Sequence, residues 1–425
     1  MRLSARMLQW CILAAAVNAP CPAADPPDKN ALLAARVRAS MEEMLHRLPD
    51  YTCVETIERS ARSPSEKKFR LLDRTRVEVA YVKGKELFAW PGAPRFEERN
   101  LAEMVGGTGA IGTGDFALHL MAAYRGNAAL EFVGNDTLAG RATLKFIQNV
   151  PIELSNFKVI VPPATGVVGY QVTAWHDARS LALQRFELLV TEFPLGIPIR
   201  RAFKAIEYQD VKVGETAFRL PAVTELSMLH ESGVESRTVS TFSQCRQYLG
   251  ESKITFGDVA PEGAETTVRG SASLPAGVSV PVKLSREIEL IAAARGDMVE
   301  MAVSRAVVHD GRTLLARGTK IAARIDKVTC ETAPYPNCFV ELRTETYEDA
   351  SRSGPFTSLL EAPTLESLLA QRRVVTSGQG PVLIPSEFAH AGSDAPILFV
   401  GPGTRLPRGY QMIWRTLEVP GGVTP

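Results

Sequence analysis

The stretch LPAGVSVPVKL, Leu274–Leu284, recurs in similar form twice more in the second half of this chain of 425 residues. The related stretches are LARGTKIAARI (Leu315–Ile325) and LPRGYQMIWRT (Leu406–Thr416). A glycine three residues after the leucine is typical of a turn that needs a positive φ, and the apolar run after it is typical of a strand. The copies start roughly 41 and then 91 residues apart, which excludes a solenoid. Three such units predict a small closed or nearly closed β-barrel.

The first half of the chain predicts an antiparallel meander. Residues 29–49 have apolar side chains at helical spacing, so we expect an amphipathic helix that ends at Pro49. From Tyr51 the period changes to two, and Gly, Asp, Asn or Ser separates the short runs. About ten strands with short links must run antiparallel, because parallel strands need long crossovers. The only helical interruption is expected around residues 98–126.

Composition shifts divide the chain into two domains. Residues 257–273 are small and polar without periodicity, so we expect a linker between a domain at 28–256 and a second domain at 274–425. An insertion of loop and short helix is expected near residues 349–377. Residues 1–24 have basic, apolar and small-residue segments in the order of a secretory signal peptide. No other stretch suits a membrane span, so we expect a mature chain without one in an oxidising compartment.

Charge and cysteine content narrow the classes of partner and cofactor. The 48 basic and 47 acidic residues form no long run of one sign, so nucleic acid is not an expected partner. Two of the six cysteines lie in the signal peptide. Cys330 and Cys338 flank a Pro-rich bend and suit a local bridge, which leaves Cys53 with Cys245. A four-thiolate metal site needs close C-x-x-C pairs, and the sequence has none, so we expect two disulfides and no metal.

Motifs for catalysis or cofactor binding are weak. GTGAIG (Gly107–Gly112) fits G-x-G-x-x-G, but no buried strand precedes it, so we interpret it as a glycine loop before a helix capped by Thr113 or Asp115. No zinc-binding histidine pair or G-x-S-x-G elbow is present. We expect no cofactor and no catalytic residues. The histidines are expected on the surface or in strands, at His46, His119, His176, His230, His309 and His390.

GYQVTAWHDARSLALQRFEL (Gly169–Leu188) resembles the strand, Asp-containing turn and strand of the LolA/RseB-type half-barrel family. LPDYTC and FSQCRQY, near the two ends of the first domain, are similar to phrases in exported proteins with such a domain. The resemblance implies an antiparallel sheet curled around helices over residues 28–256. The cysteines of the two phrases would tie the first strand to the last.

The second half resembles the TrbI-type barrel, the periplasmic part of a type IV secretion channel. The resemblance rests on Leu274–Leu284, Gly296-Asp297 and DGRTLLARGTKIAARI (Asp310–Ile325). We find no transmembrane anchor, Pro-rich spacer or long pore-lining helix, so the resemblance implies the fold and not the channel. The predicted fold class is mainly β: a curled antiparallel half-barrel with N-terminal and lid helices, followed by a small β-barrel.

A half-barrel closed by helices suggests a groove for an apolar ligand. We select Trp90, Phe116, Leu120 and Trp175 as its candidate lining residues, although large apolar side chains are more often ordinary core. We therefore expect a periplasmic or secreted, non-catalytic binding protein that holds a lipid, acyl chain or apolar peptide. The alternative is a cell-envelope scaffold or assembly protein whose small barrel docks other proteins.

Overall fold

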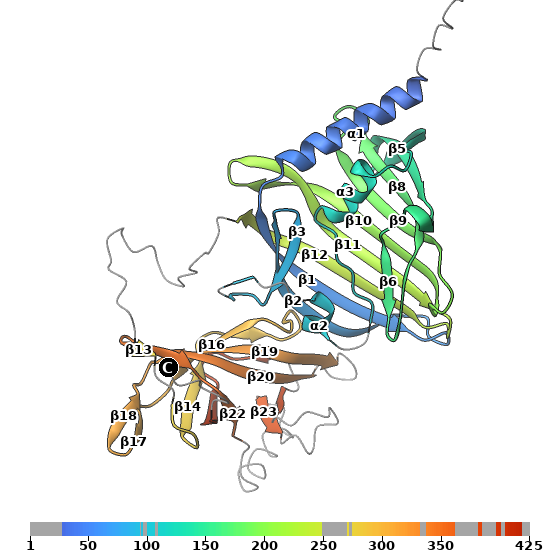
Figure 1. Ribbon diagram of the computed structural model, residues 1–425. Coiled ribbons are helices and arrows are strands. Elements are labelled where there is room, and N and C mark those ends of the chain that lie inside the picture. The colour runs from blue at the N-terminus through green and yellow to red at the C-terminus, as the bar shows by residue number, and fades with distance from the viewer. Residues whose placement is uncertain are drawn as a thin grey trace, which may run out of the picture.

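The computed structural model has a curled sheet in its first part and a small barrel in its second part (Figure 1). The signal peptide at 1–24 and the insertion residues 362–377 lie outside the described residues, as does the linker at 257–273 apart from two residues. The structure describes residues 28–93, 95–96, 100–106, 109–248, 270–271, 274–331, 337–361, 381–384, 397–400 and 404–418.

The first domain is a ten-stranded sheet in which every pair of neighbours is antiparallel. The strand order is β3-β2-β1-β12-β11-β10-β9-β8-β5-β4, so the chain closes its meander by placing the last strand beside the first. The strands are β1 (Tyr51–Arg62), β2 (Arg70–Val82), β3 (Lys85–Ala89), β4 (Glu131–Leu138), β5 (Arg141–Val150), β8 (Gly169–Asp177), β9 (Leu183–Glu192), β10 (Ile199–Val213), β11 (Thr216–His230) and β12 (Glu235–Gln247).

Helices and a hairpin pack against this curled sheet, and α1 lies across one end of it (Figure 1). Their apolar side chains form one core with the sheet, so the predicted half-barrel and its lid helices are confirmed (Figure 1). Burial alternates along β8 from Tyr170 to Ala174, as the alternation of side chains across a strand requires. The remaining elements of this domain are α1 (Lys29–Arg47), α2 (Leu101–Val105), α3 (Leu118–Arg125), the 3-10 turn η1 (Ile152–Leu154), β6 (Lys158–Val161) and β7 (Ala164–Val167).

A disulfide joins the first and last strands of the half-barrel. Cys53 in β1 is bonded to Cys245 in β12, and the two strands pair along nearly their whole length. The Cys330–Cys338 bond is also present and links directly opposite residues of two adjacent strands in the second domain. Both expected pairings are therefore found in the structure.

The second domain is a nearly closed barrel. Six of its strands follow one another in the order β20-β19-β16-β14-β26-β22. The last returns to the first, because the Thr344 and Ser358 hydroxyl oxygens lie 2.8 Å apart and the Phe356 N–H donates to the Glu345 carbonyl at 2.9 Å. Trp414 is buried at its centre. The six strands are β14 (Ser279–Leu284), β16 (Met298–Val303), β19 (Lys320–Glu331), β20 (Asn337–Glu348), β22 (Ser358–Leu360) and β26 (Gln411–Thr416).

Short strands complete this domain and correct two expectations. Residues 352–355 form β21 and residues 358–360 form β22 instead of loop and helix, because the open edges of β20 and β26 give them pairing partners. The end of the expected linker forms β13, which pairs with β21. The short strands are β13 (Gly270–Ser271), β15 (Ile288–Glu289), β17 (Val307–His309), β18 (Arg312–Leu315), β21 (Arg352–Pro355), β23 (Pro381–Ile384), β24 (Ile397–Val400) and β25 (Arg405–Leu406).

The recurring phrase is a turn that leads into a strand, as its glycine predicts. Gly277, Gly318 and Gly409 have φ values of 80°, 90° and 83°, and the strands β14, β19 and β26 follow them. Each glycine N–H donates to a carbonyl of another segment of the barrel, at 2.8 to 2.9 Å. No atom lies within 4 Å of the place where a Cβ would stand at these glycines. Backbone conformation, and not crowding, therefore requires glycine there.

We expect Gly277→Val, Gly318→Val and Gly409→Val each to destabilise the barrel by about 1–3 kcal/mol, because a β-branched residue resists positive φ. Thermal unfolding followed by near-UV circular dichroism of the barrel tryptophan measures the loss. Gly354→Val is the matched control, since Gly354 lies in β21 and is not among the positive-φ residues. Equal melting temperatures for all four variants would show that the repeated phrase has no structural role.

Candidate functional site

The four apolar residues selected from the sequence do not gather at one groove. Phe116 and Leu120 are buried in the half-barrel core. Trp90 is partly buried at the junction with the small barrel, where the Arg295 guanidinium lies 5.4 Å from its ring centroid. Trp175 donates from Nε1 to Asp136 at 2.9 Å and lies beside Lys145, on the other face of β8 from the buried His176. A ligand role for these residues stays a prediction.

The interior of the half-barrel is occupied by side chains of the chain itself. The Phe116 ring lies between Tyr51 and Phe242, with centroid distances of 5.2 and 5.1 Å. Elsewhere in the same core, α2 contributes Leu101, Met104 and Val105, all three of them buried. An apolar guest would therefore have to take the place of one of these internal segments.

A buried cluster of polar side chains fastens the segment before α3 to the sheet. Lys204 of β10 is 3% exposed, and its ammonium donates to the Asp115 carboxylate and to the Thr113 carbonyl, the latter at 3.0 Å. The same nitrogen lies 3.1 Å from Nε2 of His119. Since Asp115 and His119 are 5% and 8% exposed, all three groups are shielded from water. The ion pair and its hydrogen bonds compensate for that burial.

Two more carboxyl groups lie at this cluster. Glu86 accepts hydrogen bonds from the N–H groups of Gly114 and Phe116, at 2.6 and 3.0 Å. Burial raises the pKa of Glu86 to about 7 and that of Glu55 to about 8, and the Asp115 carboxylate adds to both shifts. Burial and the Lys204 charge lower the pKa of His119 to about 3, so this imidazole is neutral at pH 7.

This cluster changes two expectations. The N-cap residue of α3 is Ala117, with no side-chain cap, because Asp115 bonds to Lys204 instead. His119 lies buried in a helix and not on the surface or in a strand. The signal for the cluster was present in the sequence: in AFKAIEY, Lys204 shares a strand face with the apolar residues Ala202 and Ile206.

Glu55 should make the half-barrel less stable in alkali. A folded pKa of about 8 lies above the unfolded value, so the stabilisation is fully present below about pH 4 and is lost as the pH rises through 8. Between pH 7 and 9 the unfolding free energy should fall by about 1.4 kcal/mol on this account. In Glu55→Gln that part of the fall should disappear in urea unfolding. Exposed Glu66→Gln is the control, and an identical pH dependence in both variants would contradict the assignment.

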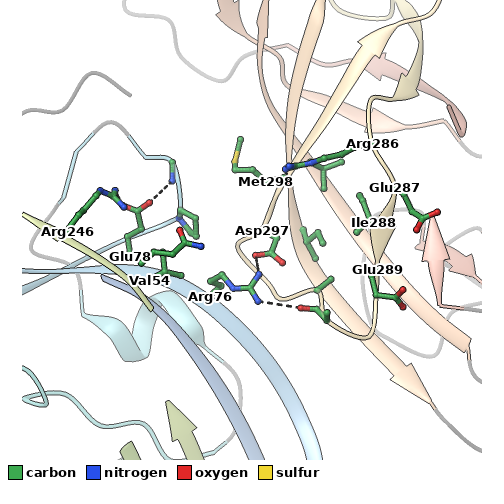
Figure 2. Close-up of a pocket in the computed structure, with 17 residues that line it drawn as sticks. Val54, Arg76, Glu78, Arg246, Arg286, Glu287, Ile288, Glu289, Asp297 and Met298 are labelled. Atoms are coloured by element: carbon green, nitrogen blue, oxygen red, sulfur yellow. Dashed lines mark hydrogen bonds and ion pairs between the residues drawn. The ribbon is translucent and has the colours of Figure 1, made fainter. Parts of the chain in front are cut away.

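A cleft of about 760 Å³ lies between the half-barrel and the small barrel. Figure 2 shows Glu78 and Arg246 on one side of it and Arg286 on the other. Arg246 donates to Glu78 at 3.2 Å. The lining residues are Val54, Arg76, Glu78, Pro91, Gly92, Gln244, Arg246, Arg286, Glu287, Ile288, Glu289, Ala292, Ala293, Asp297, Met298, Val299 and Ile325.

A bulge in β12 shapes one wall of this cleft. The register of β1 and β12 shifts between Thr52 and Val54, so that extra residues of β12 stand opposite Cys53. Gln244 lies in this bulge with a φ of 51°, which is uncommon for a residue other than glycine. Backbone strain of this kind is frequently found at binding sites.

Within the described part of the chain, no group of three or more His, Cys, Asp or Glu side chains is placed to hold a metal ion. In the same part, no helix is both long enough and apolar enough to cross a membrane.

No protein-family model and no curated protein matches this chain. Solved structures do resemble it. A DUF1329 family protein from Desulfovibrio piger has a TM-score of 0.31 and 12% identity, covering 53% of this chain and 96% of its own. A LolA superfamily protein from Nitrosomonas europaea has a TM-score of 0.27 and 14% identity, covering 51% of this chain and 93% of its own.

A third similar structure is a putative outer membrane lipoprotein-sorting protein domain from Vibrio parahaemolyticus. Its TM-score is 0.30 at 11% identity, and the match covers 53% of this chain and 96% of its own. The TrbI-type resemblance of the second half stays a prediction.

Proposed function

We propose that this chain is an exported, non-catalytic binding protein that holds an apolar ligand inside the half-barrel, in the space now filled by α2. The observation that carries the proposal is the burial of the short helix α2. α2 is only five residues long, yet Leu101, Met104 and Val105 are all buried in the core. Three apolar side chains on so short a helix occupy a place that an acyl chain fits chemically.

The backbone on the C-terminal side of α2 supports its displacement. Gly106, Gly109 and Gly114 have φ values of 58°, 124° and 93°, and glycine changes backbone conformation at little steric cost. The positive φ values at Gly106, Gly109 and Gly114 are therefore compatible with a change of backbone conformation between α2 and the polar cluster. Two disulfides support an oxidising compartment, the periplasm or the cell exterior.

Fluorescence of dansyl-labelled undecanoic acid tests this proposal. The wild-type chain should bind the probe, and Met104→Ala should bind it several-fold more tightly, because removing buried atoms leaves room in the core. Leu359→Ala, at a residue of β22 that is 44% exposed, should bind like the wild type. Absence of binding by both the wild type and Met104→Ala would rule out an apolar ligand in this place.

The cleft between the domains favours a second function, the docking of another envelope protein. Its walls combine apolar side chains such as Met298 with the guanidinium groups of Arg246 and Arg286, and Gln244 is held there by a bulge. A photo-crosslinking amino acid in place of Arg286 should capture one protein in cells, whereas the same group in place of the exposed Val308 should not. Recovery of monomer alone from both sites would contradict docking in the cleft.

A further inference from the structure

We propose that the docked small barrel holds α2 inside the half-barrel, an arrangement called the lock below. Arg295 of the small barrel makes the contact with α2. The inference rests on the proposed function for its biological meaning, but its physical content is separate. It states that the conformation of α2 depends on the docking of the second domain.

The Arg295 side chain ends at α2. Its Nη1 donates to the carbonyl oxygen of Val105, the last residue of the helix, at 2.7 Å. The last carbonyls of a helix have no partner within the helix, and the negative end of its dipole favours a cation. Arg295 comes from the loop between β15 and β16 of the small barrel, 190 residues further along the chain. One domain therefore supplies the C-terminal cap for a helix of the other.

The backbone of Arg295 is fixed to the half-barrel sheet. β3 pairs only with the C-terminal part of β2, from Glu78 onward. At the other part of that edge, the Arg295 N–H donates to the Arg74 carbonyl at 2.9 Å, and the Arg76 N–H donates to the Arg295 carbonyl at 2.8 Å. The small barrel thus adds a single residue to the edge of β2, and that residue is the one whose side chain caps α2.

A polar junction surrounds this contact. The guanidinium groups of Arg295 and Arg324 lie 5.4 and 6.0 Å from the centroid of the Trp90 ring. Arg324 also donates to the Pro91 carbonyl at 2.9 Å. Arg76 forms an ion pair with Asp297, which Figure 2 shows at the base of the cleft.

The fit of the junction leaves no room for a side chain at Gly296. A Cβ there would stand 2.3 Å from the Arg76 carbonyl oxygen and 2.8 Å from the Trp90 ring. The apolar cores of the two domains are separate clusters, and the contacts described here between the domains are hydrogen bonds, an ion pair and the Trp90 indole beside two guanidinium groups. Junctions of this kind between domains allow relative motion. When the barrel separates, the Val105 carbonyl loses its cationic partner and α2 loses its lock.

Hydrogen–deuterium exchange of the full chain tests the lock. In Arg295→Ala, the amides of α2 should exchange about tenfold faster or more, since a charge-assisted bond at the helix end is lost. Gly296→Ala should give the same acceleration without altering any group that touches α2. Arg405→Ala is the control, because Arg405 is a barrel arginine whose ion pairs are with Glu287 and Glu289. In the Arg405→Ala variant, the amides of α2 should exchange as in the wild type.

The possible results of the exchange and probe-binding experiments distinguish a failure of the lock from a failure of apolar-ligand binding. Unchanged exchange of α2 in both Arg295→Ala and Gly296→Ala, with the melting curve intact, would overturn the lock whatever the probe does. Faster exchange in both variants establishes the lock. If dansyl-labelled undecanoic acid then fails to bind the unlocked variants, the lock stands and the apolar ligand of the proposed function is wrong. If the variants with faster exchange of the α2 amides also bind the probe faster, both the lock and the apolar ligand are supported.

Discussion

Replacing Cys53 and Cys245 together by serine should lower the stability of the half-barrel by up to about 5 kcal/mol, because the bond closes a loop with a sequence separation of 192. Opening so long a loop returns much conformational freedom to the unfolded chain. The figure is an upper bound, since unfolded chains keep some structure. Urea unfolding, followed by tryptophan fluorescence of the oxidised double variant and the wild type, measures the loss.

The second disulfide provides the matched control. Cys330 and Cys338 have a sequence separation of only 8, so their replacement should cost roughly half as much and should act on the small barrel. Near-equal losses for the two double variants would contradict the loop-length argument. Peptide mapping that finds Cys53 free, or joined to Cys330, would contradict the pairing itself.

Lys204→Met should destabilise the half-barrel by about 3–5 kcal/mol, because it leaves the Asp115 carboxylate buried without its cation. The Thr113 carbonyl loses a donor in the same step. A methionine matches the length of the lysine stem, so the effect comes from the lost charge and hydrogen bonds more than from lost volume. The denaturation midpoint, measured at pH 7, reports the change.

Two further variants distinguish the loss of the Lys204 charge from the general effect of replacing a lysine by methionine. Lys212→Met replaces an exposed lysine of the same strand and should change stability by less than about 0.5 kcal/mol. Lys204→Met combined with Asp115→Leu removes both charges, and it should recover part of the loss because no unpaired charge remains. Equal destabilisation by Lys204→Met and Lys212→Met would show that the buried pair contributes nothing special.

The segment from α2 to α3, called the lid here, is held at two places by groups of different chemistry. Lys204 and Glu86 hold the segment at Thr113–Phe116 from inside the half-barrel, and Arg295 holds α2 from outside it. Gly106, Gly109 and Gly114, which have positive φ, lie along this part of the chain. The two variants Lys204→Met and Arg295→Ala therefore act on different ends of the same lid.

The sequence by itself determined the features that depend on neighbouring residues. A glycine three residues after a leucine required a turn, and Gly277, Gly318 and Gly409 all have positive φ. Short links between period-two runs required antiparallel neighbours, which the sheet order confirms. Both disulfides followed from counting cysteines and from the Pro-rich bend. These inferences succeed because the sign of φ, the strand period and loop length are local properties of the chain.

Only the tertiary structure decided which distant residues meet. Lys204 and Asp115 are 89 positions apart, and the strand period shows only that Lys204 faces inward, not which acid it meets. Arg295 reaches Val105 because the small barrel docks on the free edge of β2, which no local pattern records. Such contacts depend on the curl of the sheet and on how two finished domains fit together. Their energies arise from burial and charge across the fold, so they become visible only when the whole chain is in place.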